Sequence, residues 1–172
     1  SHSAIPVLLK LRKYIDLVIP RGGEKLIETV TNISRIPVIK HYKGICHIYV
    51  DKDADLDMAS RIVINAKVQR PGVCNALETL LVSKDIADKF IPKISRSLSE
   101  DYHVQLRGDT ASLKLATGML PASEKDWSTE YLDLILSVKI VNTIDDAITH
   151  INHYGSMHSD SIITNSEEAA RQ

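Results

Sequence analysis

The sequence has few cysteines, no long hydrophobic run and no excess of charge of one sign, and each absence excludes a class of protein. Two cysteines in 172 residues are too few for a disulfide framework, so a reducing, cytoplasmic environment is expected. No apolar run approaches the roughly 18 residues that span a membrane. A formal net charge of −1, without a block of basic residues, gives no surface that attracts nucleic acid. We therefore expect neither a membrane nor a nucleic acid as partner.

The length and the 44% of hydrophobic residues suffice for one globular domain, or for parts of two. Ser1-His2-Ser3 is typical of a cloning remnant, and residues 1–7 are expected to be such a remnant or a linker. At the other end, residues 167–172 stop inside a helical pattern. A frayed natural terminus is the alternative. We favour a piece of a longer protein.

Strand-like apolar runs alternate with helical patterns along the chain. This alternation predicts an α/β fold with an open, mainly parallel sheet and flanking helices. The expected strands cover residues 15–20, 46–50, 77–82, 104–107, 132–141 and 162–163.

Capping residues predict where several helices begin and end. Asp55 is expected to cap a helix, and Thr143 with Asp146 forms a capping box at the start of a later one, which Gly155 ends. One face of the helix after Asp55 carries the apolar residues Ala59, Ile62, Val63 and Ala66. A helix is also expected directly after Gly23, with Leu26, Ile27 and Val30 on one face.

One cysteine lies in a short loop between a predicted helix and a predicted strand. Pro71-Gly72 should end the helix, and Cys74 follows two residues later. Such a loop exposes sulfur and offers backbone N–H groups to a developing oxyanion, while Arg70 favours the thiolate. A small buried hydrophobe is the more common fate of a free cysteine, and the pattern leaves both interpretations open. Cys46 alternates with Ile48 in a strand and is expected to be a core thiol.

Several segments together resemble a known family. They are Tyr14 to Gly23, Gly44 to Asp51, Asn65-Ala66-Lys67, Gln69-Arg70-Pro71, Cys74-Asn75, Glu130-Tyr131-Leu132 and Gly155 to Asp160. In this order they are similar to the γ-glutamyl phosphate reductases of the aldehyde dehydrogenase superfamily, from about Leu8 onward. The same reductase also forms one half of bifunctional pyrroline-5-carboxylate synthases.

The resemblance implies an activity in proline biosynthesis. This is the NADPH-dependent reduction of L-glutamyl 5-phosphate to L-glutamate 5-semialdehyde, with release of phosphate. By position, Cys74 would attack the acyl phosphate and form a thioester, and its backbone N–H would donate to the oxyanion. Asn75 and His158 would lie in loops around the substrate. A homo-oligomer and functional coupling to glutamate 5-kinase are also implied, and whether a kinase is fused upstream stays open.

The resemblance further implies two cofactor contacts. Glu130 would accept hydrogen bonds from the nicotinamide ribose, and Arg21, Gly22 and Gly23 would flank the pyrophosphate. From the pattern alone, a surface glutamate and a plain tight turn are the ordinary interpretations. Residues 8–42 would be the trailing edge of the NADPH-binding domain, and residues 43–172 would be a C-terminally truncated catalytic domain. We expect the isolated chain not to turn over.

The segment before the first catalytic-domain strand lacks a carboxylate. Hydrolytic aldehyde dehydrogenases carry a glutamate base there, whereas residues 39–44 read IKHYKG. Without a base that activates water, the thioester should survive until hydride arrives, unless His41 serves instead.

Two metal-site patterns are incomplete. The aspartates at 51, 53, 55 and 57 mimic an EF-hand, but Leu56 and Ile62 stand where glycine and glutamate are required. His150, His153 and His158 lack further ligands at a zinc spacing, so no metal is expected. Two other functions remain: a self-contained dinucleotide or phosphate sensor, and a different acyl-phosphate or acyl-CoA reductase of the superfamily.

Overall fold

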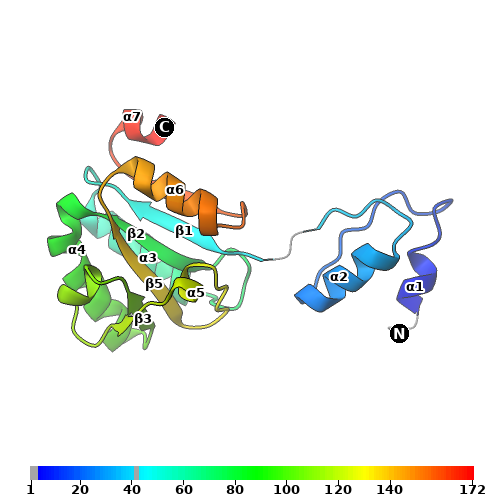
Figure 1. Ribbon diagram of the computed structural model, residues 1–172, viewed down its shortest axis with the longest axis horizontal. Helices are drawn as coiled ribbons and strands as arrows, with labels where there is room; N and C mark the ends of the chain where they lie inside the picture. Colours follow the sequence, from blue (N-terminus) through cyan, green and yellow to red (C-terminus); the bar gives the residue numbers. More distant parts are fainter. Residues whose placement is uncertain (1–3, 41–42) are drawn as a thin grey trace. The chain divides into compact units, whose positions relative to one another are not determined.

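The computed structural model describes residues 4–40 and 43–172. The chain forms two compact units, Ser1–Lys43 and Gly44–Gln172 (Figure 1). Within the described residues, no helix has both the length and the apolar character needed to cross a membrane.

The smaller unit contains helices α1 (Ile5–Leu8) and α2 (Glu24–Ile33). Gly23 is the N-cap of α2, and Ile27 and Val30 are buried on one face, as the sequence predicted. The predicted strand over residues 15–20 is wrong. Among the residues that the structure describes, Val18 alone in this run pairs, in a single parallel bridge with Val38, and Ile19 is 70% exposed. An apolar run becomes a strand only where a neighbouring strand continues the hydrogen bonds, and none does here.

The larger unit is built on an open sheet whose six strands all run parallel, which confirms the predicted fold class. The strands are β1 (Cys46–Val50), β2 (Leu77–Ser83), β3 (Gln105–Gly108), β4 (Leu120–Pro121), β5 (Ile135–Val141) and β6 (Asp160–Ile163). Their order is β4-β3-β5-β2-β1-β6, so β2 lies between β1 and β5.

Helices cover both faces of this sheet (Figure 1). The helical segments are α3 (Leu56–Val68), α4 (Lys84–Arg96) with the π-helical turn Ser97–Asp101, the 3₁₀ turn Ser112–Lys114, α5 (Glu124–Trp127), α6 (Ile144–Tyr154) and α7 (Glu167–Arg171). On one face, α3 and α4 pack on a core that includes Val50, Leu80 and Phe90. On the other, Ala147 of α6 packs on Tyr49 and Leu81.

Covering both faces changes which positions are buried. Every residue of β1 and β2 is buried, so the alternation in β1 separates two cores and does not separate core from solvent. In α3, Ile62 is exposed and Lys67 is buried, which corrects the predicted apolar face. Strand β5 begins three residues after the predicted start, because Leu132 has φ 55° and leaves the extended conformation.

The predicted helix caps are confirmed. Asp55 accepts hydrogen bonds from the N–H groups of Asp57 and Met58, at 2.9 Å each. Thr143 and Asp146 form the capping box of α6, and Gly155 is its C-cap.

Replacing Thr143 by alanine should destabilise the larger unit by about 1 kcal/mol, because the first turn of α6 loses a side-chain acceptor. Urea denaturation followed by far-ultraviolet circular dichroism measures the change. Thr143→Ser is the matched control and should retain most of the stability. If serine destabilised the unit as much as alanine, the hydroxyl would not be the stabilising group.

Candidate active site

The predicted site residues of the larger unit lie in loops that precede strands. Cys74 precedes β2, Glu130 precedes β5 and His158 precedes β6, and Gly44, which was not predicted as a site residue, precedes β1. In a parallel sheet these loops share one edge, at the amino ends of the strands. Ligands of open α/β sheets usually bind at the carboxyl ends, so this site uses the opposite edge.

Cys74 is an exposed free thiol in the loop between α3 and β2. The loop turns twice, through hydrogen bonds from the Val73 N–H to the Arg70 carbonyl (3.4 Å) and from the Ala76 N–H to the Val73 carbonyl (3.0 Å). Within the described part of the chain, the N–H groups of Cys74 and Asn75 have no acceptor. Both residues are exposed, so the loop presents a sulfur together with two adjacent donors.

Gly44 connects this loop to Glu130. A Cβ on Gly44 would overlap the carbonyl group of Cys74, so only glycine fits there. The N–H of Gly44 donates to Oε1 of Glu130 at 2.8 Å. Cys74 and Glu130 are thus both brought next to one residue, although they are distant in the sequence.

Cys46 is a buried thiol, as the sequence predicted. Its Sγ donates to the carbonyl oxygen of Cys74 at 3.2 Å, a contact that sequence reasoning missed. Burial raises the pKa of Cys46 to about 11, with the nearby charge of Asp160 adding to the shift. His158 lies beside Cys46, with Nδ1 3.9 Å from Sγ and 2.9 Å from Oγ of Ser159.

The position of Glu130 bears on the expected lack of a carboxylate before β1. No carboxylate occurs in residues 39–44, but Glu130 brings one to Gly44 from a distant part of the sequence. The absence of a local glutamate therefore does not remove carboxylates from the surroundings of Cys74. His41, the alternative base, lies outside the described residues.

The segment that carries Glu130 is held by a partly buried network. The Tyr131 hydroxyl donates to Oδ1 of Asp126 at 2.7 Å and lies 2.8 Å from Oγ of Ser137. Arg107 forms an ion pair with the same Asp126 oxygen, 2.5 Å away. Burial raises the pKa of Tyr131, which keeps its hydroxyl a donor. Tyr131 thereby anchors the chain next to Glu130.

A buried ion pair lies behind the cysteine loop, and sequence reasoning gave it no role. Nζ of Lys67 is 2.8 Å from Oε2 of Glu78, and both side chains are 0% exposed. Burial lowers the pKa of Lys67 and raises the pKa of Glu78, and each charge opposes the shift of the other. Removing one partner of such a pair costs about 3–5 kcal/mol, because a buried charge loses its compensation.

Arg21, Gly22 and Gly23 belong to the smaller unit, where all three are exposed. Gly22 has φ 155°, and Gly23 caps α2 without a side-chain acceptor. The first N–H groups of α2 therefore suit a phosphate, by their dipole and their lack of a side-chain cap.

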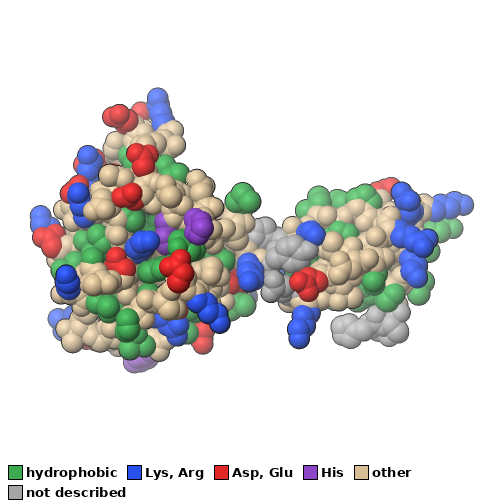
Figure 2. All heavy atoms as spheres, in the orientation of Figure 1, with side chains coloured by type: hydrophobic (Ala, Val, Ile, Leu, Met, Phe, Trp, Pro, Cys, Tyr) green, Lys and Arg blue, Asp and Glu red, His purple; other side chains and the backbone are tan. Residues whose placement is uncertain are grey.

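His150 of the larger unit is packed among aromatic side chains. The ring of His150 lies 5.5 Å from that of Trp127, and Nζ of Lys139 is 3.2 Å from its Nδ1. Burial lowers the pKa of His150 to about 3. Across residues 4–40 and 43–172, no three His, Cys, Asp or Glu side chains gather in a way that would hold a metal ion. Figure 2 shows acidic and basic side chains interspersed on the visible face of this unit.

Known proteins resemble this chain in sequence. No protein-family model matches it. A γ-glutamyl phosphate reductase from Geobacter metallireducens is 58% identical over 157 residues, which cover 91% of this chain and 37% of that relative. Another, from Limosilactobacillus reuteri, is 55% identical over 165 residues, covering 96% of this chain and 40% of that relative.

Solved structures resemble it in fold. The crystal structure of a γ-glutamyl phosphate reductase from Thermotoga maritima matches 99% of this chain and 41% of its own, with a TM-score of 0.92 and 44% identity. An acetylating aldehyde dehydrogenase from Geobacillus thermoglucosidasius matches 99% of this chain and 46% of its own, with a TM-score of 0.78. At 17% identity, that second likeness concerns the fold alone. The resemblance predicted from the motifs is thus confirmed: nearly the whole chain is homologous to γ-glutamyl phosphate reductases, and it spans about two fifths of the length of those relatives.

Proposed function

We propose that this chain forms the cysteine-bearing part of an NADPH-dependent reductase that converts L-glutamyl 5-phosphate to L-glutamate 5-semialdehyde. The observation that carries the proposal is the exposed Cys74 in a loop whose Cys74 and Asn75 N–H groups have no acceptor among the described residues, with the Glu130 carboxylate bonded to the Gly44 N–H. Identity of 55–58% to reductases of that name supports the choice of substrate.

Cys74 is the proposed nucleophile. Its thiolate attacks the acyl carbon of the substrate, a C–S bond forms, and the C–O bond to phosphate breaks. The N–H groups of Cys74 and Asn75 stabilise the oxyanion between these events. Phosphate is a good leaving group, so this step needs positioning more than acid catalysis. The products are a thioester on Cys74 and inorganic phosphate.

The cofactor of the proposed reaction is NADPH, and each unit, taken by itself, contains residues of the right chemistry. Glu130 suits the ribose hydroxyls, because a carboxylate accepts two hydrogen bonds at once. Arg21, Gly22 and Gly23 suit the pyrophosphate, at the start of α2. When bound, NADPH would supply hydride to the thioester carbonyl carbon. Cys74 would then be the leaving group, departing as the thiolate when the C–S bond breaks and the aldehyde is released.

The proposal extends to the setting of the enzyme. We propose a role in proline biosynthesis in the cytoplasm, as a homo-oligomer with functional coupling to glutamate 5-kinase, and the support for this setting is the likeness to the reductases. Within this proposal, residues 8–42 close the cofactor domain and residues 43–172 belong to the catalytic domain. Another acyl-phosphate or acyl-CoA reductase is the nearest competing function, and a phosphate-sensing module without chemistry is the more distant one.

The full-length reductase tests the proposal directly. Cys74→Ser should abolish reduction of γ-glutamyl phosphate while NADPH binding persists. Acetyl phosphate and acetyl-CoA serve as comparison substrates. Full activity of the serine variant, or a preference for either comparison substrate, would overturn the proposed function.

In the folded chain, iodoacetamide should label Cys74 quickly and Cys46 slowly. Only Cys74 is exposed, and with a pKa of about 11 Cys46 holds roughly one thiolate in 10³ at pH 8. The rate of Cys46 labelling should rise about tenfold per pH unit until the pH reaches the pKa of this thiol. Mass-spectrometric mapping after brief treatment measures both sites. Urea-unfolded protein is the control, in which the two should react alike; equal labelling in the folded chain contradicts the assigned roles.

Glu130→Gln in the full-length reductase should raise KM for NADPH and slow hydride transfer, because a neutral amide is a weaker acceptor for ribose hydroxyls. Acylation of Cys74, measured as a phosphate burst, should stay nearly unchanged. The surface variant Glu100→Gln is the control. Unchanged kinetics with NADPH would remove Glu130 from the cofactor site.

Without cofactor, the thioester on Cys74 should hydrolyse slowly, since unassisted water lacks the rate enhancement of roughly 10²- to 10⁴-fold that a general base supplies. Trapped acyl-enzyme followed over time measures its lifetime. Rapid release of glutamate that Glu130→Gln suppresses would identify Glu130 as a base. Rapid release that persists in this variant would point to another group, such as His41.

A further inference from the structure

We propose that the buried ion pair of Lys67 and Glu78 is a positioning unit, which fixes the cysteine loop relative to the segment that carries Glu130. This inference rests on the chemistry proposed for Cys74. Neither residue touches the reacting atoms in that proposal. Both act through the backbone that they hold.

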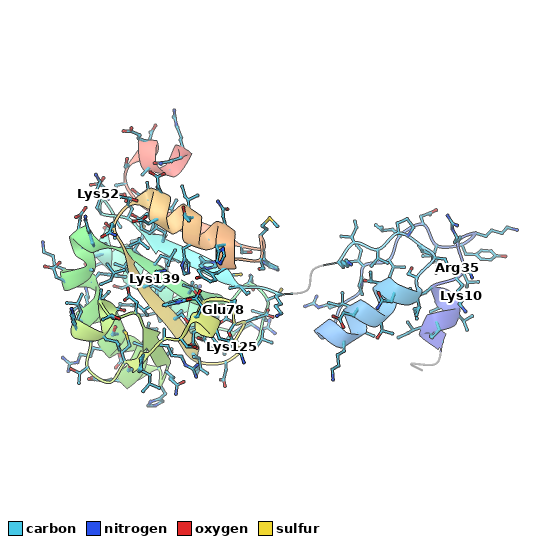
Figure 3. The ribbon with its side chains drawn as sticks, in the orientation of Figure 1. Lys10, Arg35, Lys52, Glu78, Lys125 and Lys139 are labelled. Atoms are coloured by element: carbon cyan, nitrogen blue, oxygen red, sulfur yellow. The ribbon has the colours of Figure 1, made fainter. Side chains whose placement is uncertain are left out.

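The pair closes the two ends of the cysteine loop. Lys67 lies in the last turn of α3, and Glu78 is the second residue of β2, so the loop with Cys74 is the chain between them. The contact of 2.8 Å is made by two side chains without solvent exposure. Figure 3 labels Glu78, inside the larger unit. The directional, charge-assisted hydrogen bond between Lys67 and Glu78 therefore defines where the exposed cysteine loop begins and ends.

The second oxygen of Glu78 reaches the Glu130 segment. Oε1 accepts a hydrogen bond from the Leu132 N–H at 3.2 Å. Leu132 follows Glu130 by two residues and has φ 55°, a conformation that costs a branched residue free energy and persists only where its surroundings impose it. One carboxylate therefore links the cysteine loop, through Lys67, to the backbone beside Glu130.

A break in the sheet register directs Glu78 to this position. Leu77 pairs with Cys46 and Thr79 pairs with His47, so Glu78 is an extra residue between two neighbouring pairs. This bulge shifts the alternation of β2. Leu77 consequently lies in the same core as Leu80 and Val82, although it is an odd number of residues away from Leu80. Bulges next to active sites commonly redirect a side chain in this way.

Stability alone does not explain two buried charges. An apolar pair of similar volume is often as stable as a buried ion pair, or more stable. An apolar side chain at position 78 would, however, leave the Leu132 N–H without its acceptor. The property that only the polar pair supplies is the connection between α3, β2 and the Glu130 segment.

Two double variants separate positioning from stability. Lys67→Met with Glu78→Gln removes both charges and keeps an amide oxygen for the Leu132 N–H. Lys67→Met with Glu78→Met removes the charges and the acceptor. The exposed pair Lys93–Asp57, replaced as Lys93→Met with Asp57→Asn, is the surface control and should change nothing.

In the 172-residue chain, exchange of the Leu132 amide measured by nuclear magnetic resonance should be faster in the Met/Met variant than in the Met/Gln variant. In the full-length reductase, kcat of the Met/Met variant should be lower on the order of 10²-fold, because small misplacements of reacting groups cost that much. KM for the acyl phosphate should be similar in both. Equal exchange and equal kcat in the two folded variants would overturn the inference.

The exchanged pair, Lys67→Glu with Glu78→Lys, covers the case in which an apolar variant does not fold. It keeps opposite charges, but lysine at position 78 has no acceptor for Leu132. We expect a folded protein with fast Leu132 exchange and lowered kcat; wild-type values for both would refute the positioning role. Activity of Cys74→Ser would refute the proposed function separately, and the exchange measurement does not depend on it.

Discussion

Parallel pairing of β1 and β2 is the constraint on which the rest of the larger unit depends. Because both strands run in the same direction, the loops before them arrive at the same edge, and the Gly44 backbone meets the carbonyl of Cys74 without room for a side chain. Pairing of β2 with β5 brings the Glu130 segment to that edge as well. The cysteine loop and the Glu130 carboxylate, from two distant parts of the chain, are thereby both brought to the backbone of Gly44, which belongs to a third.

Features that depend on neighbouring residues could be predicted from the sequence. Asp55 and Thr143 predict where two helices begin, because a short polar side chain accepts hydrogen bonds from backbone N–H groups two or three residues ahead. Pro71 and Gly72 interrupt the helix before Cys74 for equally local reasons. The bounds of β1 and the exposed loop of Cys74 followed from such signals. The family resemblance added the roles of Cys74 and Glu130, which remain proposals.

Features that depend on distant partners were not predictable. Lys67 is polar on any hydropathy scale, and only the position of Glu78 in three dimensions explains its burial. The hydrogen bond between Gly44 and Glu130 likewise has no signal within either segment. The strand predicted over residues 15–20 is wrong for the opposite reason, because a local signal was present and the distant partner was not. Their composition favours a strand, but extended structure requires a neighbour that the composition does not specify.

The aromatic packing of the larger unit gives the protein an internal optical probe. Trp127 is the sole tryptophan, it is buried, and it lies three residues before Glu130 in the sequence. The neighbouring His150 has a pKa of about 3 and is therefore uncharged near neutral pH. An uncharged imidazole does not quench the indole as a charged one would. Lys139, 5.3 Å from the ring centroid, supplies a fixed positive field. Emission from this single fluorophore should therefore report movement of the segment between α5 and β5 without any added label.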